Sequence, residues 1–175
     1  VDGAAFAEAL RQVLPVVSRD ESRPNLCAVN VSAAGGVAVL TASDGRRLHR
    51  AKGPGWALPT MLIPSRAASL VREFLTGPGK IGVDGTAPTL LVVQNAAGDT
   101  IVVRLADAVF PDVAPSLKAR PEYDATFSAS EMGAAVRRVC LMADGELRTL
   151  ALTFDGNRLA GGLVLTSGEA DRARE

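Results

Sequence analysis

The sequence has no excess of charge of either sign and no long apolar run. In its 175 residues, 19 Lys and Arg balance 19 Asp and Glu. Proteins that hold nucleic acid tightly by releasing counterions are strongly basic, so this balance argues against tight, autonomous DNA binding. No apolar run approaches the roughly 20 residues of a membrane helix, and no secretory signal is visible. We therefore expect a cytoplasmic protein without membrane association.

Cysteine and histidine are also scarce. Cys27 and Cys140 are too few and too far apart for a disulfide framework or a zinc site. We expect both to be small buried hydrophobes in a reducing compartment. The single histidine, His49, has no visible partner for general base catalysis, and no serine lies in a G-x-S-x-G context. We therefore expect no catalytic residues, no metal site and no cofactor.

Three segments have apolar residues at the spacing of a helix face. The first starts after Asp2, a candidate N-cap, and Pro15 lies near its end. The second follows Pro64, and the third starts with Ser128 and Glu131 at capping-box spacing. The expected apolar faces are Phe6, Leu10, Val13 and Val17; Ala67, Leu70, Val71 and Phe74; and Met132, Val136, Val139 and Cys140.

Short strand-like runs follow each helix, so that a unit of one helix and several antiparallel strands repeats. The helices start near residues 4, 65 and 129, and the runs are 27–31, 37–40, 81–84, 89–94, 100–105, 147–154 and 158–165. One such unit leaves a sheet face uncovered, so two units are needed to close a core. We therefore expect an α+β protein with a complete domain at 1–119 and the first half of a second at 120–175.

Four short motifs lie in a particular order along the chain: SDGRRL at 43–48, IP at 63–64, RL at 104–105 and FPD at 110–112. With the third helix running into LALTF at 150–154, the chain resembles the bacterial DNA polymerase III beta sliding clamp family. The resemblance covers that family's middle domain and the first half of its C-terminal domain. It implies a sliding-clamp fold, with the helices on one face of the sheets. It also implies a non-catalytic DNA polymerase processivity factor and peptide-binding scaffold in replication and repair.

The resemblance also implies a pocket for linear peptide motifs of polymerase, clamp loader or repair proteins. The matching residues are Leu26, Ser43, Gly45, Arg46, Arg47, Leu48 and Pro111. By composition alone, Asp44-Gly45 is more typical of an ordinary hairpin turn with solvated arginines beside it, because turns of this composition are common. The chain departs from the family in two ways: Arg46 replaces a common His, and residues 113–117 lack the usual basic pair. The second half of the family's pocket comes from the end of the C-terminal domain, beyond the matched segment.

Positions that face DNA in the family carry arginine in this chain. They are Arg19, Arg23, Arg66 and Arg137. If the four arginines shared one wall, double-stranded DNA would be attracted weakly and without regard to sequence. The alternative is that they are ordinary solvated side chains.

Two functions remain open at this level. A ring subunit of the family has three domains, and the chain matches one and a half. It is therefore either a clamp, or a piece of one, that joins a homo-oligomeric ring, or a clamp-fold sensing or oligomerising module of a transcriptional regulator that forms no ring. Binding of a clamp-type peptide distinguishes the first function from the second.

Overall fold

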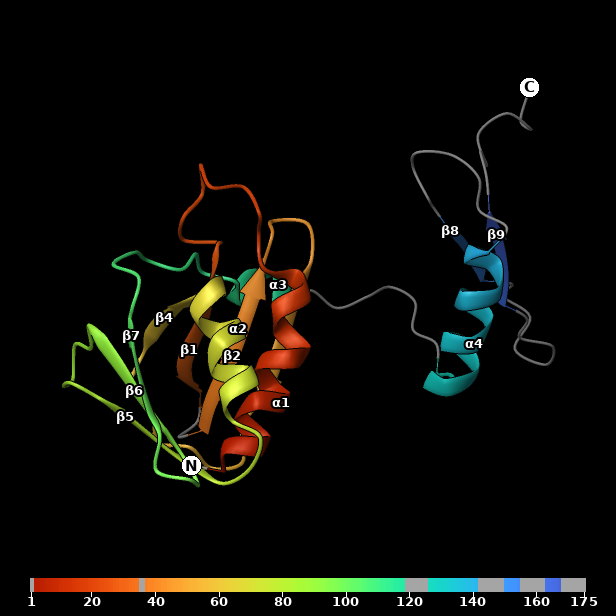
Figure 1. Ribbon diagram of the computed structural model, residues 1–175. Coiled ribbons are helices and arrows are strands. Elements are labelled where there is room, and N and C mark those ends of the chain that lie inside the picture. The colour runs from red at the N-terminus through yellow and green to blue at the C-terminus, as the bar shows by residue number, and fades with distance from the viewer. Residues whose placement is uncertain (1, 35–36, 119–125, 142–149, 155–162, 168–175) are drawn as a thin grey trace. The chain divides into compact units, whose positions relative to one another are not determined.

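The computed structural model describes residues 2–34, 37–118, 126–141, 150–154 and 163–167. The chain forms two compact units, Val1–Leu117 and Lys118–Glu175, and each is described here by itself (Figure 1).

The first helix, α1 (Gly3–Val13), begins and ends as its sequence predicts. The backbone N–H groups of Ala4 and Ala5 donate to Asp2 Oδ1 at 3.0 and 3.3 Å, so Asp2 is the N-cap. Pro15 lies in a 3-10 turn, η1 (Leu14–Val16), that ends the helix. The helix buries Phe6, Leu10 and Val13 completely.

The second helix, α2 (Ser65–Phe74), follows Pro64 as expected and turns most of the predicted face to the core, since Val71 is buried and Ala67 and Phe74 pack against the core. Leu70 was assigned to the buried face, and it is 51% exposed. The buried residues are Ala68 and Val71, with Leu75 just beyond the helix. The cause is tertiary: α2 packs on α1, β1 and β4 at once, and these contacts set the rotation of the helix about its axis.

Two antiparallel sheets complete the first unit. The four-stranded sheet has the order β3-β2-β1-β4 and the three-stranded sheet the order β5-β6-β7. Their bounds are β1 Ala28–Ala34, β2 Val37–Ser43, β3 Leu48–Lys52, β4 Met61–Pro64, β5 Gly79–Val83, β6 Leu90–Asn95 and β7 Thr100–Arg104. The sequence analysis missed β4, a strand of four residues without a pattern of its own.

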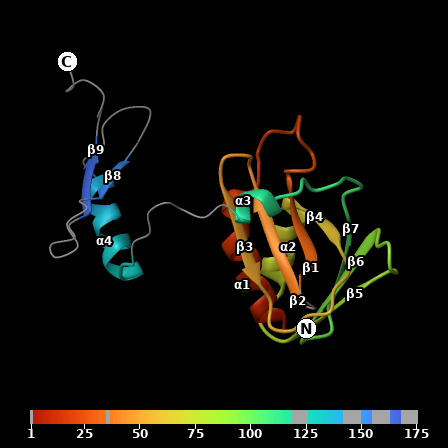
Figure 2. The same ribbon diagram turned by 180° about the vertical axis from the view of Figure 1, so that it is seen from behind.

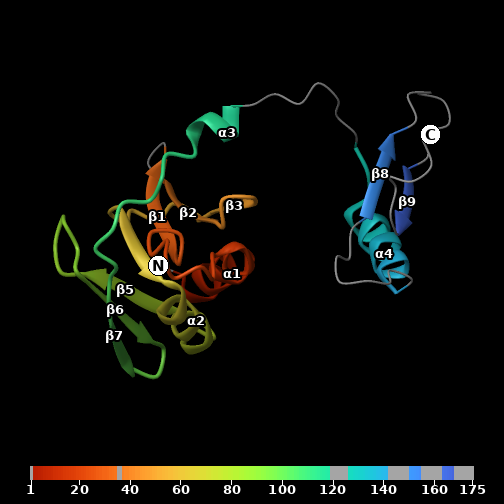
Figure 3. The same ribbon diagram turned by 90° about the horizontal axis from the view of Figure 1, so that it is seen from above.

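The helices α1 and α2 lie side by side on one face of the strands (Figures 1 and 2). Seen from above, the strands of both sheets lie on one side of this helix pair (Figure 3). The core lies between these layers and is closed by Trp56, which is 4% exposed and packs edge-on against Phe6 with ring centroids 5.2 Å apart.

The second unit contains α4 (Ala129–Cys140) and the antiparallel strands β8 (Leu150–Phe154) and β9 (Leu163–Ser167). Ser128 caps the helix, because its Oγ accepts the Glu131 N–H at 3.4 Å. A short helix that the sequence did not predict, α3 (Ala114–Lys118), ends the first unit.

The expectation that both cysteines are buried is wrong. Cys27 is half-buried and Cys140 is exposed. Cys140 is the last residue of α4, so it lies beyond the half-buried part of the helix around Val136 and Val139.

Candidate functional site

The turn between β2 and β3 carries most of the predicted peptide-binding residues, and Asp44 organises it. The Asp44 carboxylate accepts the backbone N–H groups of Arg47 at 2.8 Å and Arg46 at 2.9 Å. It also pairs with the Arg47 guanidinium at 2.9 Å. These bonds, above all the one from the Arg47 backbone, hold the pKa of Asp44 well below its usual range. Gly45 supplies the left-handed residue of the turn, with φ +88°.

Two of the predicted peptide-binding residues, Ser43 and Leu26, are buried, and the guanidinium of a third, Arg47, is paired with Asp44. Ser43 donates to the Arg47 carbonyl at 2.8 Å and accepts the Gly45 N–H at 3.1 Å. Ser43 and Leu26 are each 7% exposed, and the Arg47 guanidinium is occupied by Asp44. Gly45, Arg46 and Arg47 are exposed and Leu48 is half-buried, so all four are accessible at the turn.

Arg23, assigned by resemblance to the DNA-facing group, lies beside this turn. A Cβ added to Gly45 would be 3.3 Å from Arg23 Nη1. Arg23 also pairs with Asp20 at 3.1 Å. The loop before β1 therefore brings a third arginine to the turn, next to Arg46 and Arg47.

The other predicted DNA-facing arginines are exposed and lie on three different segments. Arg19 lies in the loop before β1, Arg66 in the first turn of α2, and Arg137 on α4 of the other unit. On α1 and α2, two further arginines are neutralised: Arg11 pairs with Glu8 at 2.6 Å and Arg72 with Glu73 at 2.9 Å. The helix layer of the first unit therefore has little unbalanced positive charge.

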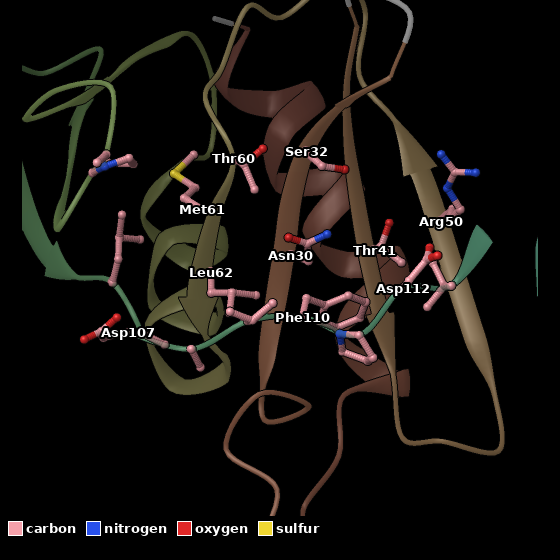
Figure 4. Close-up of a pocket in the computed structure, with 18 of the residues that line it drawn as sticks. Asn30, Ser32, Thr41, Arg50, Thr60, Met61, Leu62, Asp107, Phe110 and Asp112 are labelled. Atoms are coloured by element: carbon pink, nitrogen blue, oxygen red, sulfur yellow. The ribbon is translucent and has the colours of Figure 1, made fainter. Parts of the chain in front are cut away.

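Residues 105–113, here called the strap, cross the face of the four-stranded sheet that is opposite to the helices (Figure 4). The Ala106 N–H donates to the Leu62 carbonyl at 2.9 Å and the Leu105 N–H to the Thr89 carbonyl at 2.9 Å. Farther along, Asn25 Nδ2 donates to the Val109 carbonyl at 3.4 Å. These hydrogen bonds join the strap to β4, to the residue before β6 and to the loop before β1.

A cavity of about 790 Å³ lies between the strap and this sheet face. Its floor includes one row of side chains that crosses all four strands, because Asn30 is paired with both Leu62 and Thr41, and Thr41 with Arg50. Side chains alternate along a strand, so the neighbours of this row, such as Val29 and Leu40, point into the core.

Among the seven predicted peptide-binding residues, Pro111 alone lines this cavity. The turn residues adjoin it, however. Ser43 is paired with Leu48, just as Thr41 is paired with Arg50 on the same two antiparallel strands. In each strand, the residues of the two pairs are two positions apart. Residues two apart share a sheet face and are separated by about 6.6 Å. The structure therefore places the predicted turn site and the strap cavity next to each other.

Sequence reasoning missed Asn30, Thr41, Arg50 and Leu62 as site residues. A partial signal was present, since Asn30 and Ser32 alternate with Val29 and Val31 and must lie on the opposite face. The position of Leu62 depended on β4, which was not predicted.

The described part of the chain lacks two other kinds of site. No three of its His, Cys, Asp and Glu residues are grouped so that they could hold a metal ion. None of its helices has the length and apolar character that a membrane span requires.

The arrangement of helices and sheets is the sliding-clamp fold. The beta sliding clamp of C. crescentus matches with a TM-score of 0.73 and 19% identity, over 97% of this chain and 50% of that one. The sliding clamp of Bacillus subtilis matches with a TM-score of 0.69 and 21% identity, over 95% of this chain and 47% of that one. The sliding clamp of Bartonella birtlesii, solved bound to griselimycin, matches with a TM-score of 0.70 and 18% identity, over 95% of this chain and 49% of that one.

A relationship is also visible in the sequence. The beta sliding clamp of Micrococcus luteus is 28% identical over 179 aligned residues, which cover 99% of this chain and 56% of that protein. The chain thus spans about half the length of the curated relative that it matches. No protein-family profile matches the chain. The resemblance to the bacterial DNA polymerase III beta sliding clamp family is confirmed, and these relatives give no support to the transcriptional-regulator alternative.

Proposed function

We propose that the chain is part of a beta-clamp-type processivity factor. It would act without catalysis in the cytoplasm, surrounding DNA and tethering replication or repair proteins. The observation that carries this proposal is similarity to sliding clamps along nearly the whole chain, in fold and in sequence. In this proposal residues 1–119 are a complete clamp domain, and residues 120–175 are the first half of the next.

Double-stranded DNA would be held only weakly. The proposed contacts are Arg19, Arg23, Arg66 and Arg137. The ion pairs of Arg11 and Arg72 on α1 and α2 leave little free positive charge on the helix layer, and the chain as a whole is neutral. Attraction of this kind is screened by salt and independent of sequence, which suits a protein that slides.

A linear peptide would bind at the turn between β2 and β3. Leu26, Leu48 and Pro111 would give apolar walls, and Ser43 and Gly45 shape the turn. Arg46 is exposed there, and Arg23 lies against Gly45. Arginine heads can bond peptide carbonyls while their stems pack on apolar groups. Arg47 would contribute its stem, since its head is engaged by Asp44.

The test is a titration of the chain with a fluorescein-labelled peptide in which a polar residue is followed by aliphatic and aromatic residues. We expect saturable binding by fluorescence polarisation, reduced at least about tenfold by Leu48→Asp, because a charge would then face the apolar peptide. Leu70→Asp is the matched control, since it makes the same change at an exposed position on the helix layer. Circular dichroism checks that both variants fold.

Two results would overturn the proposal. One is an absence of binding to the unmodified chain even at millimolar concentrations. The other is equal loss of binding in the Leu48→Asp and Leu70→Asp variants, which would mean that the turn is not the site.

A further inference from the structure

The floor of the strap cavity carries three hydrogen-bonding side chains in one row: Asn30, Thr41 and Arg50. Neighbouring strands are about 4.8 Å apart, so the row is about 10 Å long. Within the described residues, none of the three side chains makes a hydrogen bond or an ion pair to another residue. Figure 4 shows all three on the face of the sheet that the strap crosses.

Thr41 is the central member of the row and the most informative one. It is 2% exposed, yet its hydroxyl has no partner among the described residues. A buried hydroxyl without a partner is costly, and native proteins satisfy nearly all such groups. The Thr41 hydroxyl is not fully enclosed by protein: among the described residues, only Trp56 Nε1 is a fully enclosed side-chain nitrogen or oxygen without a hydrogen-bond partner. The Thr41 hydroxyl is therefore open to the cavity that it lines.

The chemistry of the row favours an acidic group. The Arg50 guanidinium, the Asn30 amide and the Thr41 hydroxyl can all donate, and a carboxylate only accepts. Arginine binds carboxylates with two parallel hydrogen bonds. The cavity lining also contains Arg104, Asp107 and Asp112. The two aspartates are exposed and lie on the strap rather than on the floor, and Asp112 accepts the Ala114 N–H at 2.9 Å at the start of α3.

The size and place of the cavity favour a peptide as the carrier of that group. A volume of about 790 Å³ lies in the range of sites that enclose drug-sized ligands. The row is also next to the pair Ser43 and Leu48 of the proposed peptide site. The separation of about 6.6 Å equals two residues of an extended peptide. Apolar walls are supplied by Leu62 and Phe110.

We propose that the strap cavity is a second subsite of the peptide-binding surface. It takes an acidic residue that flanks the apolar core of the partner peptide, with Arg50, Thr41 and Asn30 donating to the carboxylate. This inference rests on the proposed function, because it presumes that a peptide occupies the adjacent turn.

The experiment compares three labelled peptides with the same apolar core. One has two Glu before the core, one has two Glu after it, and one has Gln at all four positions. We expect one acidic peptide to bind about tenfold more tightly than the Gln peptide at physiological salt, as charge-assisted hydrogen bonds allow. Arg50→Gln should remove this preference, so that the acidic peptides and the Gln peptide bind with similar affinity.

The matched control is Lys52→Gln, which removes a positive charge two residues along the same strand and outside the cavity lining. It should keep the preference. Arg50→Lys keeps the charge but loses the two-pronged geometry, so it should keep only part of the preference. It also provides a readout if Arg50→Gln does not fold.

The outcomes separate the two proposals. If all three peptides bind equally, the acidic subsite is refuted and the proposed function stands. A preference that survives Arg50→Gln refutes the role of Arg50. If no peptide binds, the proposed function fails and the subsite fails with it.

Discussion

Gly53 is the position at which one added methyl group should disturb the core most. A Cβ at Gly53 would lie 1.9 Å from Trp56 Cε3, whereas carbon atoms in contact are about 3.5–4.0 Å apart. The backbone cannot easily yield, because the Gly53 N–H donates to the Ala38 carbonyl and the Ala38 N–H to the Trp56 carbonyl, both at 3.0 Å. In a Gly53→Ala variant the indole ring must therefore move by about 2 Å.

The expected cost follows from the surroundings of that ring. Trp56 packs on the fully buried Phe6. Overpacking a core typically costs about 1–3 kcal/mol, and removing a buried Trp side chain about 3–5 kcal/mol. If the indole ring moves out of the core, its Nε1–H, which has no hydrogen-bond partner in the core, can donate to water. This hydration offsets part of the lost packing free energy. We expect Gly53→Ala to lower the free energy of unfolding by about 3 kcal/mol.

The assay is urea unfolding followed by fluorescence, since Trp56 is the only tryptophan. With a slope of about 1–3 kcal/mol per molar urea, the midpoint should fall by at least about 1 M, and native emission should shift to the red. The control is Gly77→Ala, where no atom lies within 4 Å of an added Cβ and the midpoint should hardly change. Equal midpoints and unchanged emission for the two variants would refute this description of the core.

Two further outcomes are expected. Asp84 accepts hydrogen bonds from Thr89, and the Thr89 hydroxyl is the largest cause that lowers the Asp84 pKa from 3.8 to about 2. Its contribution to stability is therefore present above pH 3.8 and lost as the pH falls towards 2. Asp84→Asn should flatten the loss of stability over this range, whereas Asp107→Asn should not, as urea midpoints at several pH values would show. On α2, Leu70→Glu should change stability by less than about 0.5 kcal/mol and Leu75→Ala should cost about 2–5 kcal/mol; equal effects would contradict the observed helix face.

Local chemistry made several elements predictable from sequence. Asp2 and Ser128 cap α1 and α4 because their side chains reach backbone N–H groups only a few residues away. Pro15 ends α1 because it lacks an N–H donor. The short motifs in their order along the chain, together with the helix-plus-strands repeat, were enough to indicate a resemblance to the sliding-clamp fold. The roles of the peptide-binding and DNA-facing residues stay proposals.

The errors have a common origin in contacts between distant residues. The helix period alone put Leu70 on the buried face, but packing against α1, β1 and β4 decided which face is buried. Folding of the loop before β1 also placed Arg23 beside Gly45, a neighbour that the sequence did not indicate, and the DNA-facing role of Arg23 stays a proposal.

The sequence by itself determined the helix ends, most strands and the turn at Asp44-Gly45, and its short motifs indicated the resemblance to sliding clamps. Each of these features depends on residues close together in the chain, or on short motifs that can be recognised one by one. The tertiary structure decided the row of Asn30, Thr41 and Arg50 and the cavity above it. That row exists because strand register aligns three separate segments, and the strap covers it through hydrogen bonds to Leu62, Thr89 and Asn25. Register and strap bonds depend on the packing of the whole unit, so no local pattern reveals them.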